Sequence, residues 1–224
     1  MTLPEVDIDL ILSLLVEAYG DRKWKSRLEP VGELVLTILS QNTSDANSRH
    51  AFESLLSAFP NWDRLAAAST REIAKAIRSG GLSEAKAKYI GSSLKLIKKK
   101  MPDFDLRFLK DMGLEEAREW LLRLPGVGMK TASCVLLFSL GMPAFPVDTH
   151  VYRVARRLGL ISGGVSVDAA HVEMERLVYP SDVYRCHVLF IEHGRRTCRA
   201  QRPLCKSCVL ASICPSYKLF ADAM

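Results

Sequence analysis

The sequence has few features of membrane-spanning, secreted or sheet-rich proteins. None of its apolar runs reaches the roughly 18 residues that a membrane-spanning helix needs. Met1 is not followed by the charged and then apolar segment of a secretory signal. No stretch alternates apolar and polar residues for long enough to predict a sheet, and we find no internal repeat or low-complexity linker. We therefore expect a protein without membrane spans that is not secreted.

Apolar residues instead recur at helical spacing along most of the chain, which predicts an all-α fold. Ser69 and Glu72 have the spacing of a capping box, and Ser83 and Asp148 directly precede helical patterns. Helix ends are expected at Gly20, Pro60, Gly80, Gly81 and Gly141. The predicted helices are 6–19, 31–41, 45–59, 70–79, 84–100, 114–123, 129–140, 149–158, 168–178 and 182–192.

The length of 224 residues allows one large domain or two small ones. A net charge of +6 is compatible with a polyanionic partner. The segment 185–206 contains six basic residues and only one acidic residue, Glu192. We expect the basic residues to contact phosphate, rather than only to balance the negative charge of nearby thiolates. These six residues are Arg185, Arg195, Arg196, Arg199, Arg202 and Lys206.

Four cysteines lie within seventeen residues, a spacing that lets their thiolates converge on one soft metal centre. We set a disulfide framework aside, because a chain without a signal segment stays in a reducing compartment. Zinc and an iron–sulfur cubane both suit a Cys-x2-Cys pair, so the spacing alone leaves the metal open. The expected ligands are Cys198, Cys205, Cys208 and Cys214, whereas Cys134 and Cys186 fall in predicted helices and are expected to be buried thiols.

A second motif is the turn Leu124-Pro125-Gly126-Val127-Gly128 between two predicted helices. Its two glycines leave the backbone uncovered, and the free N–H groups of the next helix form a site for phosphate. Lys130 lies in the first turn of that helix, where the helix dipole and apolar neighbours disfavour its charged form. A neutral lysine can act as a nucleophile. An ion pair between Lys130 and a phosphate explains the position equally well.

Asp148 favours the nucleophile interpretation of Lys130. The helix 129–140 is about 18 Å long, and the seven residues 141–147 can span roughly 23 Å when extended. The chain can therefore return Asp148 to the level of Lys130. We expect Asp148 to act both as the N-cap of helix 149–158 and as the carboxylate beside the amine.

Together these motifs resemble endonuclease III, a helix–hairpin–helix DNA glycosylase with an iron–sulfur loop. The resemblance rests on the Leu-Pro-Gly-Val-Gly-x-Lys-Thr-Ala hairpin, the Val147-Asp148-Thr149-His150 segment with Arg153, and the cysteine spacing. It covers about residues 30–215. It also includes Gly81-Leu82 followed by Lys86-Ala87 and Ile90, and His193-Gly194-Arg195 before the first cysteine.

The resemblance implies two helical lobes, a six-helix lobe of residues 23–142 and a discontinuous lobe of 1–22 with 143–224. It implies that Lys130 is the nucleophile, that Asp148 assists it, and that the four cysteines hold a [4Fe–4S] cluster. One polar side chain would fill the space of the extruded base; Gln41 and Asn42 both fit, and we favour Asn42. The other DNA-binding residues would be Leu82 as an apolar plug, Gly126, Gly128, Lys130, Arg195 and Arg199.

The implied activity is removal of a damaged base, followed by β-elimination at the abasic (AP) site. Relatives that only remove the base have serine or tyrosine where this chain has Lys130, so we expect both activities. We expect a monomer that acts on double-stranded DNA containing a damaged base or an AP site, in the cytoplasm with the nucleoid or in a nucleus. Oxidised pyrimidines are the expected substrates, with oxidised purines, mismatched thymine or modified cytosine as alternatives. A non-catalytic DNA-binding module and a zinc protein are competing hypotheses.

Overall fold

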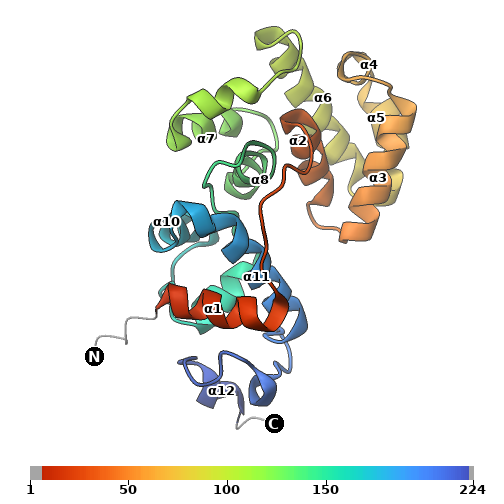
Figure 1. The fold of residues 1–224 in the computed structure, drawn as a ribbon. Coiled ribbons are helices and arrows are strands. Elements are labelled where there is room, and N and C mark those ends of the chain that lie inside the picture. Colours follow the sequence, from red (N-terminus) through yellow and green to blue (C-terminus); the bar gives the residue numbers. More distant parts are fainter. Residues whose placement is uncertain (1–6, 222–224) are drawn as a thin grey trace. The chain divides into compact units, whose positions relative to one another are not determined.

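The structure is a computed structural model that describes residues 7–221, and within them the chain forms helices and turns but no strand (Figure 1). The all-α prediction is therefore confirmed for this part of the chain. The chain divides into two compact units. Unit 2 is Ser26–Met142, and unit 1 combines the described residues up to Lys25 with those from Pro143 onward. The sequence analysis placed the first boundary at residue 23, whereas the chain enters unit 2 after Lys25.

Unit 2 has seven α-helices, where six were expected. The additional helix, Trp62–Ala67, is too short for a clear apolar period, but the Asn61 side chain caps it by accepting a hydrogen bond from the Arg64 N–H at 2.9 Å. The helices are α2 (Pro30–Ser40), α3 (Asp45–Ala58), α4 (Trp62–Ala67), α5 (Thr70–Ala76), α6 (Ser83–Lys100), α7 (Leu114–Leu122) and α8 (Met129–Leu140), with the 3-10 turns η1 (Arg78–Gly80) and η2 (Arg107–Asp111).

The core of unit 2 forms around α8. This helix is apolar on almost every side, and a helix of that kind is stable only when it is surrounded. It packs against α2 and α7, while α6 packs against α4 and α5. Ile38 of α2, Leu94 of α6 and Leu136 of α8 are completely buried. This packing fixes the turn before α8, which carries the expected hairpin.

Unit 1 contains α1 (Ile8–Tyr19), α9 (Thr149–Arg157), α10 (Val167–Leu177), η3 (Pro180–Asp182), α11 (Val183–Arg196), η4 (Cys205–Ser207) and α12 (Tyr217–Ala221). Helix α11 packs against α1 and α9, and Leu15, Val154 and Phe190 are buried there. The sequence analysis missed α12, which has only five residues. The predicted start of the first helix at residue 6 lies outside the described residues.

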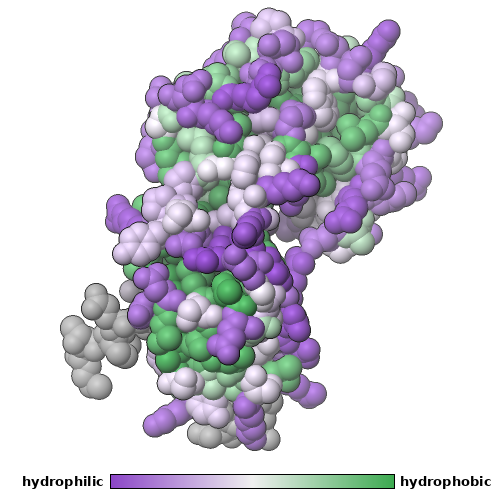
Figure 2. All heavy atoms as spheres, in the orientation of Figure 1, coloured by the Kyte–Doolittle hydropathy of each residue, from purple (hydrophilic) through white to green (hydrophobic). Residues whose placement is uncertain are grey.

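Most of the expected helix ends agree with the structure. Ser69 and Glu72 form the predicted capping box, and Gly141 ends α8 with a left-handed φ of 67°. The prediction of a cap at Ser83 is wrong, because Leu82 occupies the N-cap position of α6 and Ser83 is its first helical residue. On the face drawn in Figure 2, hydrophilic side chains are spread over both units with hydrophobic ones between them. None of the described helices has the length and apolarity to span a bilayer.

Candidate functional site

The expected hairpin is the turn between α7 and α8 in unit 2. Its backbone closes with a hydrogen bond from the Val127 N–H to the Leu124 carbonyl at 3.2 Å. Gly126 has a φ of +77°, which only glycine adopts at little cost. The Ser93 hydroxyl donates to the Pro125 carbonyl at 2.9 Å. The turn is therefore held from α6 as well as by its own backbone.

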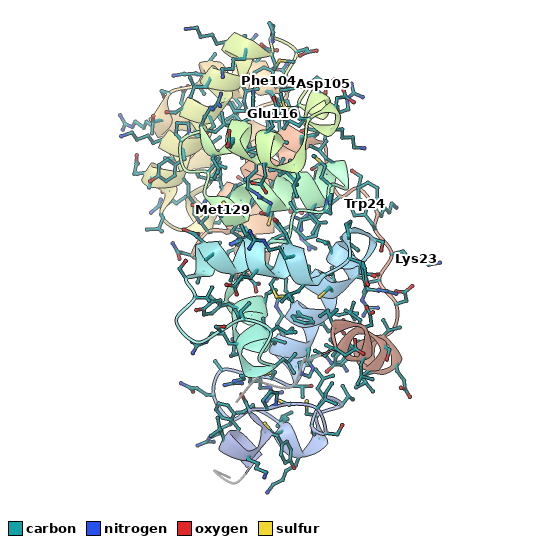
Figure 3. All side chains as sticks on the ribbon, turned by 90° about the vertical axis from the view of Figure 1, so that its left-hand side faces the viewer. Lys23, Trp24, Phe104, Asp105, Glu116 and Met129 are labelled. Carbon is teal, nitrogen blue, oxygen red and sulfur yellow. The ribbon has the colours of Figure 1, made fainter. Side chains whose placement is uncertain are left out.

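The N–H groups in the first turn of α8 have no side-chain cap. Gly128 is the N-cap residue and has no side chain to accept a hydrogen bond from them. Met129, labelled in Figure 3, is the first helical residue, and Lys130 follows it with an exposed side chain. Free N–H groups at a helix N-terminus form an anion site. The expectation that apolar neighbours desolvate Lys130 is not met, since its side chain is exposed.

We predict that Gly126→Ala destabilises unit 2. A Cβ at this position would lie 2.4 Å from Cγ of Tyr89, and the left-handed φ would strain any L-residue. The expected loss is about 1–3 kcal/mol of unfolding free energy, measured by urea denaturation. Gly128→Ala is the matched control, because a Cβ at Gly128 meets nothing within 4 Å and its φ is negative. Equal stability of the two variants would contradict this account of the turn.

Gln41 and Asn42 follow α2 in the same unit, and the structure gives them different surroundings. The Gln41 side-chain amide donates to the Gly126 carbonyl at 3.1 Å and lies 3.4 Å from the Thr131 hydroxyl. Gln41 therefore supports the hairpin. Asn42 is exposed with a left-handed φ of 52°, a conformation that asparagine tolerates better than most residues. The structure thus leaves the Asn42 side chain, and not that of Gln41, without a partner among the described residues.

Leu82 precedes α6 and is unusually exposed for a leucine, at 61% of its surface. Its φ of 47° follows Gly81 at 67°, so two consecutive residues are left-handed. A simple capping hydrophobe would pack against its helix. Its exposure argues against a simple packing role, and the apolar plug stays a prediction.

Asp148 is the N-cap of α9 in unit 1, as expected. Its Oδ1 accepts a hydrogen bond from the Val151 N–H at 2.7 Å. The segment before it is fixed from two helices: Glu175 of α10 accepts from the Phe145 N–H at 2.8 Å, and His187 Nδ1 of α11 lies 2.8 Å from the Pro146 carbonyl. The carboxylate is therefore held in place by the cap and by these two contacts.

The four cysteines of the C-terminal loop surround one cavity in unit 1. The cavity has about 410 Å³ of empty space, open solvent at its mouth included. Apolar side chains such as Leu158, Leu210 and Phe220 form much of its wall. Its four thiols are those of Cys198, Cys205, Cys208 and Cys214, and none of them is in a disulfide.

The thiols around this cavity suit a soft cation. Burial, together with the charge of neighbouring thiolates, raises the pKa of the Cys208 thiol to about 11 and raises the pKa of Cys205 and Cys214. A bound cation would favour the thiolates instead. Within residues 7–221, no three Cys, His, Asp or Glu side chains lie close enough together for a single metal ion. All four thiols nevertheless line the same cavity.

The basic residues around the loop have divided roles. Arg157 donates to the Cys198 sulfur at 3.3 Å and to the Arg199 carbonyl at 2.7 Å. Arg153 donates to the carbonyl of Cys198 at 2.9 Å. The sequence analysis did not assign Arg157, and its position in α9 carries no signal for this contact. Arg195 and Arg199 are exposed, as a role in phosphate contact requires.

Two of the six basic residues expected to meet phosphate are instead engaged in ion pairs. Arg185 pairs with Asp182, and Arg196 donates to Glu192 at 2.9 Å. Phosphate contact for these two arginines is therefore not supported. Because each partner lies three or four residues away on the same stretch of helix, the interaction is of a common local kind.

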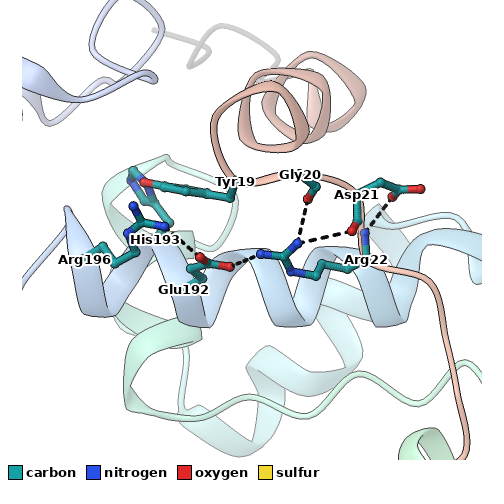
Figure 4. Close-up of polar contacts among 7 residues, drawn as sticks. All are labelled: Tyr19, Gly20, Asp21, Arg22, Glu192, His193 and Arg196. Atoms are coloured by element: carbon teal, nitrogen blue, oxygen red, sulfur yellow. Dashed lines mark hydrogen bonds and ion pairs between the residues drawn. The ribbon is translucent and has the colours of Figure 1, made fainter.

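A polar network connects the end of α1 to α11 near the cysteines (Figure 4). The Tyr19 hydroxyl lies 3.0 Å from His193 Nδ1 and 3.0 Å from the Thr197 hydroxyl. Burial lowers the pKa of His193 to about 4, so the imidazole is neutral at neutral pH. Its Nε2 lies 3.7 Å from the Cys208 sulfur. Arg22 joins the network by donating to Glu192 at 2.7 Å.

The structure thus places Lys130, Gly126, Gly128, Gln41, Asn42 and Leu82 in unit 2. Asp148, Arg195, Arg199 and the four cysteines lie in unit 1. Each group is organised within its own unit by the contacts described above.

Comparison with known proteins identifies the family. Residues 35–180 match the model described as the HhH-GPD superfamily base excision DNA repair protein. A candidate DNA glycosylase of Arabidopsis thaliana is 35% identical over 189 residues, which are 84% of this chain but only 64% of the plant protein. The chain therefore matches less than two thirds of that relative. Endonuclease III of Sulfolobus acidocaldarius is 33% identical over 186 residues, 82% of this chain and 81% of that protein.

Two solved structures extend the comparison over nearly the whole chain. A non-covalent endonuclease III–DNA complex has a TM-score of 0.85 at 28% identity and covers 99% of this chain and 100% of that one. A trapped covalent intermediate of endonuclease III with DNA has a TM-score of 0.82 at 28% identity and covers 97% and 99%. The chain belongs to the HhH-GPD superfamily of base excision DNA repair proteins and, within it, to the endonuclease III-like DNA glycosylases and AP lyases.

Proposed function

We propose that this protein is a bifunctional DNA glycosylase and AP lyase that removes oxidised pyrimidines from double-stranded DNA. The observation that carries the proposal is the hairpin, in which uncapped N–H groups of α8 stand beside an exposed Lys130. The N–H groups would bind a phosphate of the backbone without reading bases. The Lys130 amine would then lie close to the bound DNA strand when the target nucleotide is extruded from the base stack.

In the proposed reaction the ammonium of Lys130 first loses a proton to solvent, and the neutral amine then attacks C1′ of the extruded nucleoside. The bond from C1′ to the base breaks, and the base leaves with the electron pair of that bond and takes up a proton. The bond from C1′ to O4′ then breaks, a proton passes from the nitrogen to O4′, and the nitrogen forms a Schiff base with C1′ of the opened sugar. Loss of a proton from C2′ then expels the 3′ phosphate, and hydrolysis of the Schiff base returns the free lysine. Asp148 would stabilise positive charge as it develops on the sugar.

Asn42 and Leu82 would support the extruded state. Asn42 would occupy the space left by the base, and Leu82 would insert beside the opposite strand. Both side chains are exposed on left-handed residues of unit 2, which is what supports these roles. Arg195 and Arg199 of unit 1 would contact the phosphate backbone.

We further propose that Cys198, Cys205, Cys208 and Cys214 hold a [4Fe–4S] cluster. The support is the donor set and the cavity, since the four thiols line one cavity and none of them is in a disulfide. A bound cluster would cross-link a loop that has almost no core of its own. We propose that the protein acts as a monomer, and in the compartment of the chromosome, either a nucleoid or a nucleus.

The function is tested with a panel of duplexes that each carry one defined lesion. We expect release of thymine glycol or another oxidised pyrimidine together with strand cleavage, and a covalent protein–DNA adduct when borohydride reduces the Schiff base. If the protein instead prefers oxidised purines, the proposed substrate class is wrong, although the glycosylase activity is retained. Salt-sensitive binding without release or cleavage would overturn the enzymatic proposal in favour of a DNA-binding module.

Asp148→Asn separates the two roles assigned to this residue. Asparagine caps a helix about as well as aspartate, so we expect the thermal midpoint to stay unchanged. Base release should slow by on the order of 10²-fold or more, because the negative charge is lost. Single-turnover excision and thermal denaturation measure the two effects. Asp168→Asn, at an exposed site in the first turn of α10, is the matched control. Unchanged excision by Asp148→Asn would contradict the assignment.

A further inference from the structure

Lys86 is a buried lysine to which the proposed chemistry gives no role. It is the fourth residue of α6, in unit 2, and only 2% of its surface is exposed. Its ammonium donates to the Leu39 carbonyl and to the Gly80 carbonyl, each at 2.8 Å. One cation therefore binds the backbone at two places that are far apart in the sequence.

Both carbonyls lie just before a loop proposed to enter DNA. Leu39 is in the last turn of α2, three residues before Asn42, and Gly80 ends η1, two residues before Leu82. The backbone N–H of Lys86 also donates to the Leu82 carbonyl at 3.1 Å. Lys86 thus contacts the segment of Leu82 twice and the segment of Asn42 once.

The two loops need such support because their backbones are strained. Asn42, Gly81 and Leu82 all have left-handed φ values, between 47° and 67°. Left-handed residues other than glycine persist only where the surrounding structure fixes them. An exposed Leu82 side chain cannot provide this by its own packing. The contacts of Lys86 act on the backbone itself.

Simple core filling does not explain a lysine at this position. Burial disfavours the ammonium and lowers the pKa of Lys86, and the N-terminal turn of a helix also disfavours a cation. An apolar side chain of similar length would avoid both costs. What an apolar side chain cannot supply is a donor to two carbonyls at once.

We propose that Lys86 is a positioning residue that couples the Asn42 loop to the Leu82 loop, so that both side chains enter the duplex as one unit. The inference rests on the proposed function and adds a residue to it. Lys86 does not touch the nucleotide, and its effect is exerted only when a base must be extruded from a duplex.

The test compares Lys86→Met with the wild-type protein on two substrates. Methionine keeps an unbranched side chain, is one atom shorter, and removes both hydrogen bonds. On a lesion duplex with 2-aminopurine opposite the lesion, we expect excision to fall about tenfold to a hundredfold, with loss of most of the fluorescence increase that reports unstacking. On an AP site in single-stranded DNA, where no stacked partner is displaced, cleavage should change by less than about threefold. An equal loss on both substrates would overturn the proposal.

Lys88→Met is the matched control, because Lys88 is exposed on the same helix and loses the same charge. It should behave like the wild type on both substrates. If Lys86→Met also behaves like the wild type on the duplex, the coupling role is refuted while the glycosylase proposal stands. If the wild-type protein neither cleaves DNA nor is trapped on it, the proposed function itself fails.

A second measurement keeps Lys86 intact, in case its replacement prevents folding. Coupled loops predict that Asn42→Ala and Leu82→Ala are not independent. If the two fold-losses of the single variants simply multiplied, they would give an expected rate of base excision for the double variant. With coupled loops, the measured rate on the duplex should be at least about threefold higher than this expected rate. Effects that simply multiply would refute the coupling. Both variants are at exposed positions, so folding should be retained.

Discussion

Lys130→Ala is expected to abolish the borohydride-trapped adduct and to reduce strand cleavage at AP sites by on the order of 10³-fold or more. The physical reason is that alanine has no amine to form the Schiff base, and no other group can substitute at the same place. Binding should weaken by less than about tenfold, since a single solvated ion pair between Lys130 and one phosphate contributes at most about 1 kcal/mol. Denaturing gels of the trapped species and fluorescence anisotropy measure the two quantities.

The control for this variant is Lys75→Ala, another exposed lysine of unit 2 that lies at the end of α5. It loses the same charge and should be trapped as efficiently as the wild type. A trapped adduct in Lys130→Ala would show that another amine is the nucleophile. Loss of binding together with cleavage would instead support the alternative in which Lys130 only pairs with a phosphate.

The helices were predictable because most of them have one buried face, which produces a regular apolar period. The period fails for α4 and α12, which have six and five residues and complete fewer than two turns. The error at Ser83 has a different origin. A serine before a helix is a good cap on average, but here the left-handed Leu82 occupies the cap position.

The site was predictable where the chemistry lies in adjacent residues. Gly126 and Gly128 define the hairpin locally, and the cysteine spacing defines the cavity. Contacts between distant segments could not be read in this way. The hydrogen bond from Gln41 to the Gly126 carbonyl joins residues 85 positions apart, and that of Lys86 to Leu39 joins residues 47 apart. The first of these contacts engages the Gln41 side chain, which the sequence alone does not show.

The prediction that all six basic residues near the cysteine loop contact phosphate was too broad. An arginine can pair with a neighbouring carboxylate as well as with a phosphate. Asp182 lies three residues before Arg185, outside the segment in which the basic residues cluster, yet it pairs with Arg185. Glu192 was counted as a single opposing charge, although it accepts from both Arg22 and Arg196. A count along the sequence therefore overstates the cationic surface around the cysteines.

Cys208→Ser is expected to remove the proposed cluster and to disorder the C-terminal loop. Purified wild type should be yellow-brown with about four iron atoms per chain, whereas the variant should be nearly colourless with well under half of that iron. Between Cys198 and Cys214 only Pro203 and Leu210 are buried, so the loop has almost no core of its own. Iron analysis, the visible spectrum and limited proteolysis of this segment measure the loss.

Cys134→Ser is the matched control, because it makes the same substitution at a buried cysteine of unit 2. It should keep its colour and iron, with a cost of about 1–3 kcal/mol in unfolding free energy for burying a hydroxyl. A colourless wild type with one zinc per chain would contradict the cluster and support a zinc site. The contrast is informative because Cys208 touches the network of Tyr19 and His193. Loss of the cluster should therefore loosen the end of α1 as well, which faster hydrogen exchange of the amides near Tyr19 would reveal.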